Sequence, residues 1–192
     1  FAIQWLLLDS ELFARTSNYK CFLNVLCCLV VYFVVQLFTN NSGLSCIISH
    51  VTLLCFAFVN YFVYLFRGNE FQFADMRSIG TGLSVAGNYQ LRLNDKGAYV
   101  IFATALFIAF VRKCHIKFAH AWKMRIIDVM LATIACMTVV VNAYDINTET
   151  WEQKGTYRNG YLLNYVLGIR DSFISAPEGY SKDKIKELEK TY

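Results

Sequence analysis

The sequence predicts an all-α, polytopic membrane domain, and three observations carry this prediction. Hydrophobic residues make up 56% of the 192 residues and charged residues only 17%, whereas soluble chains average roughly 25% charged residues. The chain contains 16 Phe and a single Pro, a composition that favours uninterrupted apolar helices. Several apolar runs also approach the ~20 residues that a bilayer-spanning helix needs. We therefore expect four full transmembrane helices plus a truncated first one, together with interfacial helices.

The expected spans follow directly from the apolar runs. The four full spans are predicted at Cys21–Thr39, Leu44–Phe66, Gly97–Val111 and Ile126–Ala143. The third run is short by itself, and it reaches a spanning length if the basic side chains that follow it extend toward the interface. The first eight residues, FAIQWLLL, are interpreted as the end of a further span whose beginning is missing.

The distribution of basic residues predicts the orientation. The segment Arg112–Arg125 carries five Lys or Arg and no acid, which is typical of a cytoplasmic loop. Alternation then places residues 67–96 and the tail from Tyr144 outside. We expect a multi-pass protein of the cell membrane whose C-terminal tail is extracellular.

Two regions are predicted. Residues 1–143 form the transmembrane domain, with an outside interfacial segment at 67–96. Residues 144–192 form an extracellular linker with amphipathic helices, the first over Tyr161–Phe173. The sequence ends on a charged run, SKDKIKELEKTY, which is typical of a linker, so we expect another domain beyond it.

The chain shows no motif for catalysis or nucleic-acid binding. P-loop, GxSxG, HExxH and Rossmann patterns are absent from the sequence, and no basic tract is dense enough to indicate nucleic acid. The seven cysteines lie in or beside apolar runs, as expected for small buried hydrophobes. His115 and His120 would point to different sides of a helix, so we predict no metal site. For His50, a buried polar contact and a proton-relay role both remain open.

The strongest candidate site is the polar stretch FRGNEFQFAD that follows the second span. The planar guanidinium of Arg67 suits bidentate contact with a phosphate, and Asp75 and Asn88 are suited to accept hydrogen bonds from glycerol hydroxyls. This pattern indicates recognition of an anionic lipid head group. The alternative is a plain interfacial anchor, with Asp75 as a helix N-cap.

Two motifs resemble the lipoteichoic acid synthase family of Gram-positive bacteria. The first is FRG, followed by an aspartate eight residues after the arginine and then by GTGLSVAGNY. The second is NGYLLNYVLGIRDSFISAPEGYSKDKIKELEKTY, which resembles the family's stretch between its last span and its catalytic domain. Together they cover about 60 residues. Family members commonly have proline and tryptophan just before the aspartate, where this chain has Gln72-Phe73-Ala74.

The resemblance implies a five-helix membrane domain whose C-terminus lies outside. It also implies a phosphoglycerol transferase that takes glycerol phosphate from a phosphatidylglycerol-like lipid and passes it to a cell-envelope polymer. The family's chemistry belongs to a sulfatase-like extracellular domain with a threonine nucleophile and a divalent metal, Mn or Mg. This segment would then have no catalytic residue or cofactor of its own, and its partners would be the lipid and that domain. The alternative is a stand-alone polytopic membrane protein, transporter-like or an accessory subunit.

Overall fold

In the computed structural model, residues 16–78, 80, 95–114, 122–148, 150 and 155–173 are described, and every element among them is a helix. Four helices are long: α3 (Asn18–Thr39), α4 (Ser42–Arg67), α6 (Asp95–Lys113) and α7 (Trp122–Asp145). Three are short: the 3-10 helix η1 (Phe73–Ser78), α8 (Thr156–Asn159) and α9 (Tyr161–Ser172). The predicted all-α class is confirmed.

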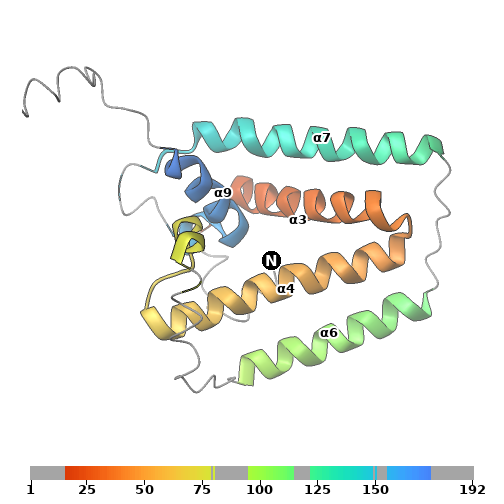
Figure 1. Ribbon diagram of the computed structural model, residues 1–192, viewed down its shortest axis with the longest axis horizontal. Coiled ribbons are helices and arrows are strands. Elements are labelled where there is room, and N and C mark those ends of the chain that lie inside the picture. Colours follow the sequence, from red (N-terminus) through yellow and green to blue (C-terminus); the bar gives the residue numbers. More distant parts are fainter. Residues whose placement is uncertain are drawn as a thin grey trace, which may run out of the picture.

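The four long helices lie side by side in the order α7, α3, α4, α6 (Figure 1). Helix α3 packs between α7 and α4, while α6 packs against α4. The contact between α4 and α6 is built on Leu54, Ala57, Tyr61 and Val100. His50 also lies on this contact, where its Nε2 is 3.2 Å from the hydroxyl of Thr104. The structure therefore gives His50 a polar partner on the neighbouring helix.

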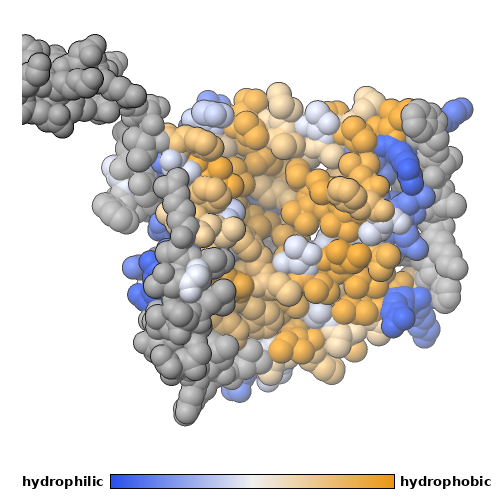
Figure 2. Space-filling view, viewed as in Figure 1, coloured by the Kyte–Doolittle hydropathy of each residue, from blue (hydrophilic) through white to orange (hydrophobic). Residues whose placement is uncertain are grey.

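Within the described part of the chain, three helices are long and apolar enough to cross a membrane: Asn18–Thr39, Ser42–Leu65 and Lys123–Asp145. Helix α6 is not among them, because charged residues at both of its ends leave only 97–111 uncharged. The prediction of four full spans is thus confirmed for three, and residues 1–8 lie outside the described part of the chain. Figure 2 shows a broad hydrophobic belt between two hydrophilic ends, as expected for a membrane-embedded protein.

A two-residue connection, Asn40 and Asn41, joins the first two spans. Asn40 ends α3 in the left-handed conformation at φ 51°, which Asn tolerates better than most residues. The side chain of Asn41 then caps α4 by accepting a hydrogen bond from the backbone N–H of Leu44 at 3.1 Å. Gln36 is buried beside this turn and donates to Ser42 at 3.3 Å.

The opposite end of the helices is covered by η1 and α9 (Figure 1). Leu163 and Leu167 of α9 are buried with Leu23 of α3 and Ala143 of α7. The predicted helix over 161–173 therefore exists. Its most buried residues are Tyr161, Leu163 and Leu167, and Leu163 and Leu167 pack against α3 and α7 of the same chain.

Candidate functional site

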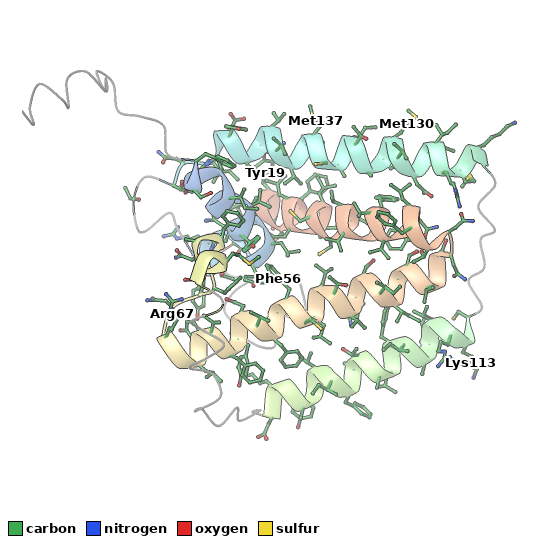
Figure 3. All side chains as sticks on the ribbon, in the orientation of Figure 1. Tyr19, Phe56, Arg67, Lys113, Met130 and Met137 are labelled. Carbon is green, nitrogen blue, oxygen red and sulfur yellow. The ribbon has the colours of Figure 1, made fainter. Side chains whose placement is uncertain are left out.

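An open pocket of 480 Å³ lies at the end of the helices that η1 and α9 cover. Its walls come from the last turn of α4, from residues 68–74 and from α9, with Thr148, Gly155 and Tyr157 completing the lining. Arg67 and Lys113 mark the two opposite ends of the molecule, and Phe56 lies beneath α9 on the pocket side (Figure 3). The pocket therefore opens at the same end as the predicted site FRGNEFQFAD.

Arg67 and Asp75, which we call the rim pair, form an ion pair at this end. One guanidinium nitrogen of Arg67 donates to Asp75 Oδ1 at 2.7 Å. The Arg67 side chain is 46% exposed, so its remaining donors can still reach a ligand. Gly68 places the pair by ending α4 in the left-handed conformation at φ 68°, as glycine commonly does after a helix.

Asp75 is not at the N-cap position that the anchor interpretation predicted for it. Asp75 lies inside η1, and its Oδ2 accepts a hydrogen bond from the backbone N–H of Gln72 at 2.8 Å. This is the back-bonding half of a capping box, in which the third helical residue reaches the residue before the helix. The third predicted site residue, Asn88, lies outside the described residues.

Glu70 forms a second polar cluster only three residues beyond Arg67. Its carboxylate accepts hydrogen bonds from the backbone N–H of Thr156 at 2.9 and 3.0 Å and from the Thr156 hydroxyl at 2.5 Å. Asn164 donates to the same carboxylate at 3.4 Å. Burial raises the pKa of Glu70, and the hydrogen bonds from Thr156 oppose that rise. This cluster holds α8 and α9 against the end of α4.

Asn24 makes the corresponding contact from α3. It is fully buried, donates to the backbone carbonyl of Asn159 at 2.7 Å, and accepts from the backbone N–H of Leu163 at 3.1 Å. Gly160 lies directly against it, since a Cβ at Gly160 would be only 2.7 Å from Asn24 Cγ. We call Asn24, Glu70, Thr156, Asn159, Gly160 and Asn164 the docking joint.

Two further contacts hold the pocket-lining residues Phe71 and Tyr165 in place. Asn60 of α4 is buried, and its side-chain oxygen accepts a hydrogen bond from the backbone N–H of Phe71 at 2.8 Å. Tyr165 packs edge-on to Phe56 at 4.9 Å between ring centroids and lies nearly parallel to Phe71 at 6.3 Å. These aromatic contacts join α4, the segment after it and α9 into one wall.

Arg170 fixes the end of α7 to the same region. Its guanidinium donates to the backbone carbonyls of Ala143 and Ile146, at 2.5 and 2.7 Å, and to the hydroxyl of Thr148. It also pairs with Asp171 at 2.7 Å. A cation at a helix C-terminus is favourable because the last carbonyls carry partial negative charge. Arg170 therefore positions α9 relative to the last membrane helix.

The sequence predicted both residues of the rim pair as site residues, but it did not predict the docking joint. One signal was present, because Asn24 is a polar residue inside an apolar run, and such a residue needs hydrogen-bond partners. The partners of Asn24 lie 135 and 139 residues away in the chain, and no local pattern reveals them. The structure thus brings Arg67 and Asp75 together, as the sequence analysis expected of one site. The docking joint, which the sequence did not predict, holds the segments that surround this pair.

The fold and the site define a helical membrane protein with a polar, aromatic-walled pocket at one end of its spans. The chain matches no family model, no curated protein and no solved structure.

Proposed function

We propose that this chain is a membrane domain that anchors an enzyme and presents a lipid head group at its outer surface. The observation that carries the proposal is the position of the rim pair. Arg67 is exposed beside a pocket at the end of a membrane-spanning helix, and lipid head groups lie at that depth. A guanidinium in such a place suits a lipid phosphate.

In the proposed orientation, the turn Asn40–Asn41 and the C-terminal end of α6 lie on the cytoplasmic side. The end that carries the pocket then faces the outside. Arg112, Lys113, Lys123 and Arg125 all lie at the ends of α6 and α7 that are remote from the pocket. An excess of basic residues is expected on the cytoplasmic side. Helix α6 lies alongside α4 in the same layer, which supports its assignment as a fourth span.

The enzyme proposed is a lipoteichoic acid synthase-like phosphoglycerol transferase of the cell membrane. The support is the pair of motifs FRG…D and NG-aromatic, both of which lie at the pocket end. The lipid would be phosphatidylglycerol-like, and chemistry would belong to a sulfatase-like domain following the tail. The divalent metal, Mn or Mg, would be held there. In the described residues Glu70, Asp75 and Asp171 already accept hydrogen bonds from the chain, and they do not form a metal site.

The alternative of a stand-alone transporter receives less support. Asn24, Gln36 and Asn60, the three amide side chains inside the first two spans, are bonded to turns and helix ends at both surfaces. A transport path would need polar groups free to face a channel at mid-membrane. These three amides instead fix the connections between helices, while His50 contacts Thr104 of α6.

The coding sequence downstream of Tyr192 tests the proposal. We expect it to continue into a sulfatase-like domain with a threonine near its start and a later set of Asp and His metal ligands. Arg67→Ala in the full-length protein should then lower glycerol phosphate transfer from phosphatidylglycerol, roughly tenfold for the loss of one charge-assisted phosphate contact. A stop codon shortly after Tyr192 would refute the enzyme function and leave an accessory membrane protein.

A further inference from the structure

Basic side chains gather at the end of the molecule that is remote from the pocket. Arg112 and Lys113 end α6, and Lys123 and Arg125 lie in the first turn of α7. All four are exposed, and Figure 3 labels Lys113 at this end. Asp128, the acidic residue that follows in the second turn of α7, is buried. We call the four cations the basic end, and it presents positive charge to its surroundings.

Helix stability does not explain the two cations of α7. The N-terminal end of a helix carries partial positive charge, so Lys and Arg in the first turn are unfavourable there. Arg125 donates from Nε to Asn40 Oδ1 at 3.2 Å, which joins α7 to the turn between the first two spans. A guanidinium has five N–H donors, so Arg125 can hold this turn and contact an anion at the same time.

Helix α6 places its two cations at the depth of lipid phosphates. Its uncharged stretch, 97–111, is about 22 Å long at 1.5 Å per residue, whereas the hydrocarbon core of a bilayer is about 30 Å thick. In a bilayer that α4 crosses, the neighbouring α6 (Figure 1) therefore brings its charged residues to the boundary between hydrocarbon and head groups. Long basic side chains extend from that boundary to the phosphates.

Helix α6 also has a small contact with the other helices. It packs against α4 through the apolar cluster that contains Val100 and through the contact of Thr104 with His50. Its other side exposes aromatic rings, among them Tyr99, Phe102 and Phe110. An anchor at the end of α6 would therefore add to a limited protein contact.

We propose that the basic end binds the phosphates of anionic phospholipids in the leaflet opposite to the pocket, and that this binding anchors α6 beside α4. Clusters of four to eight Lys and Arg directly beside a membrane helix are typical of contact with an anionic membrane surface. The four side chains are exposed and come from two helices, so the surface selects net negative charge and not one head group. The inference goes beyond the proposed function, because the pocket and the rim pair lie at the other end.

Matched variants separate this surface from charge elsewhere on the same helix. Arg112→Gln/Lys113→Gln removes the cations of α6, and Lys123→Gln/Arg125→Gln removes those of α7. Lys96→Gln is the control, since Lys96 is also exposed and lies in the first turn of α6, at the opposite end. Melting temperatures in detergent identify any variant that fails to fold.

The test is lipid binding to the full-length protein in nanodiscs, measured by native mass spectrometry. Phosphatidylserine is compared with phosphatidylcholine, because only the first carries net negative charge. We expect phosphatidylserine to be preferred, and each neutralised cation of the basic end to lower the preference roughly fivefold. Lys96→Gln should retain the preference. Added salt should weaken it, because exposed charges are screened.

Hydrogen–deuterium exchange tests the anchoring of α6. Backbone amides of 97–113 should exchange more slowly in bilayers that contain phosphatidylserine than in phosphatidylcholine alone. This difference should disappear in Arg112→Gln/Lys113→Gln and remain in Lys96→Gln. Exchange rates that are equal in the two bilayers would overturn the anchoring role.

The remaining outcomes concern the ligand and its site. Equal binding of phosphatidylserine and phosphatidylcholine overturns the proposal, and so does a preference that survives removal of all four cations. Inorganic phosphate that displaces phosphatidylserine would identify a soluble anion as the ligand and overturn the lipid assignment. A stop codon after Tyr192 refutes the transferase and leaves the lipid preference unchanged, so the two proposals fail separately.

Discussion

The rim pair and the docking joint are two polar clusters with members only three residues apart, Arg67 and Glu70, yet they depend on different parts of the chain. Arg67 pairs with Asp75, eight residues away, and nearly half of its side chain faces solvent. Glu70 binds Thr156, 86 residues away, and Thr156 is fully buried. The first cluster is local and accessible, whereas the second holds distant segments together.

This difference separates binding from architecture. Exposed ion pairs contribute only about 0–1 kcal/mol to stability because solvent screens them. A buried donor that loses its acceptor costs about 1–3 kcal/mol. We therefore expect substitutions in the docking joint to alter the fold, and substitutions in the rim pair to alter ligand binding while the fold is kept.

The largest effect is expected for Gly160→Ala. Gly160 has φ 76° and ψ 157°, and its Cβ would overlap the side chain of Asn24. Gly155→Ala is the matched control, since Gly155 has φ 102° and ψ 157° but nothing within 4 Å of a Cβ. Both variants bear backbone strain of about 1–3 kcal/mol. Gly160→Ala should lower the melting temperature in detergent clearly further, and equal melting temperatures would refute the contact with Asn24.

The next effect is expected for Glu70→Ala. It leaves the buried N–H and hydroxyl of Thr156 without their acceptor, at a cost of about 1–3 kcal/mol for each group. Limited proteolysis should then cut the segment 155–173 more rapidly. Glu70→Gln keeps a side-chain oxygen as acceptor and should restore most of the protection. Proteolysis rates that do not change in Glu70→Ala would contradict the role of Glu70 as a clamp.

A smaller effect is expected in the pH dependence of stability. The folded state raises the pKa of Glu70 above its ordinary value of 4.5, so the folded state holds this proton more tightly than the unfolded state. Its contribution to stability is therefore greatest below pH 4.5 and falls as pH rises through the folded-state pKa. The stability of wild type relative to Glu70→Gln should decrease over that window. A relative stability that increases with pH would reverse the sign of the shift.

The smallest effect on stability is expected for Arg67→Ala. It removes one exposed ion pair, so the free energy of unfolding should change by about 0–1 kcal/mol. The conservative variant Arg67→Lys keeps the positive charge but loses the planar fork of the guanidinium. Melting curves of both variants should overlay that of wild type, and a large destabilisation would place Arg67 in the architecture.

The sequence predicted the features that depend on local pattern. Apolar length predicted α3, α4 and α7, and the polar stretch that begins with FRG contained both residues of the rim pair. The predicted span at α6 is not among the helices long and apolar enough to cross a membrane, because its uncharged stretch covers only 97–111. Length and charge are local properties, and both can be measured without a structure.

The docking joint depends on contacts that sequence order does not reveal. In the sequence, Asn24 is an isolated polar residue within an apolar run. Its partners Asn159 and Leu163 can be identified only from the structure, in which α9 lies over the end of α3. Gly160 likewise appeared as part of a motif, while its physical requirement is the side chain of Asn24 against its Cα. Such constraints arise from packing between distant segments.

The most direct test of this account is phosphatidylglycerol binding by Arg67→Ala in the full-length protein, measured beside its melting temperature. For Arg67→Ala we predict a roughly tenfold loss of affinity with an unchanged melting temperature. For Glu70→Ala we predict the opposite pattern, in which the main change is a lower melting temperature. Affinity that stays at the wild-type value in Arg67→Ala would contradict the assignment of the rim pair to the lipid head group.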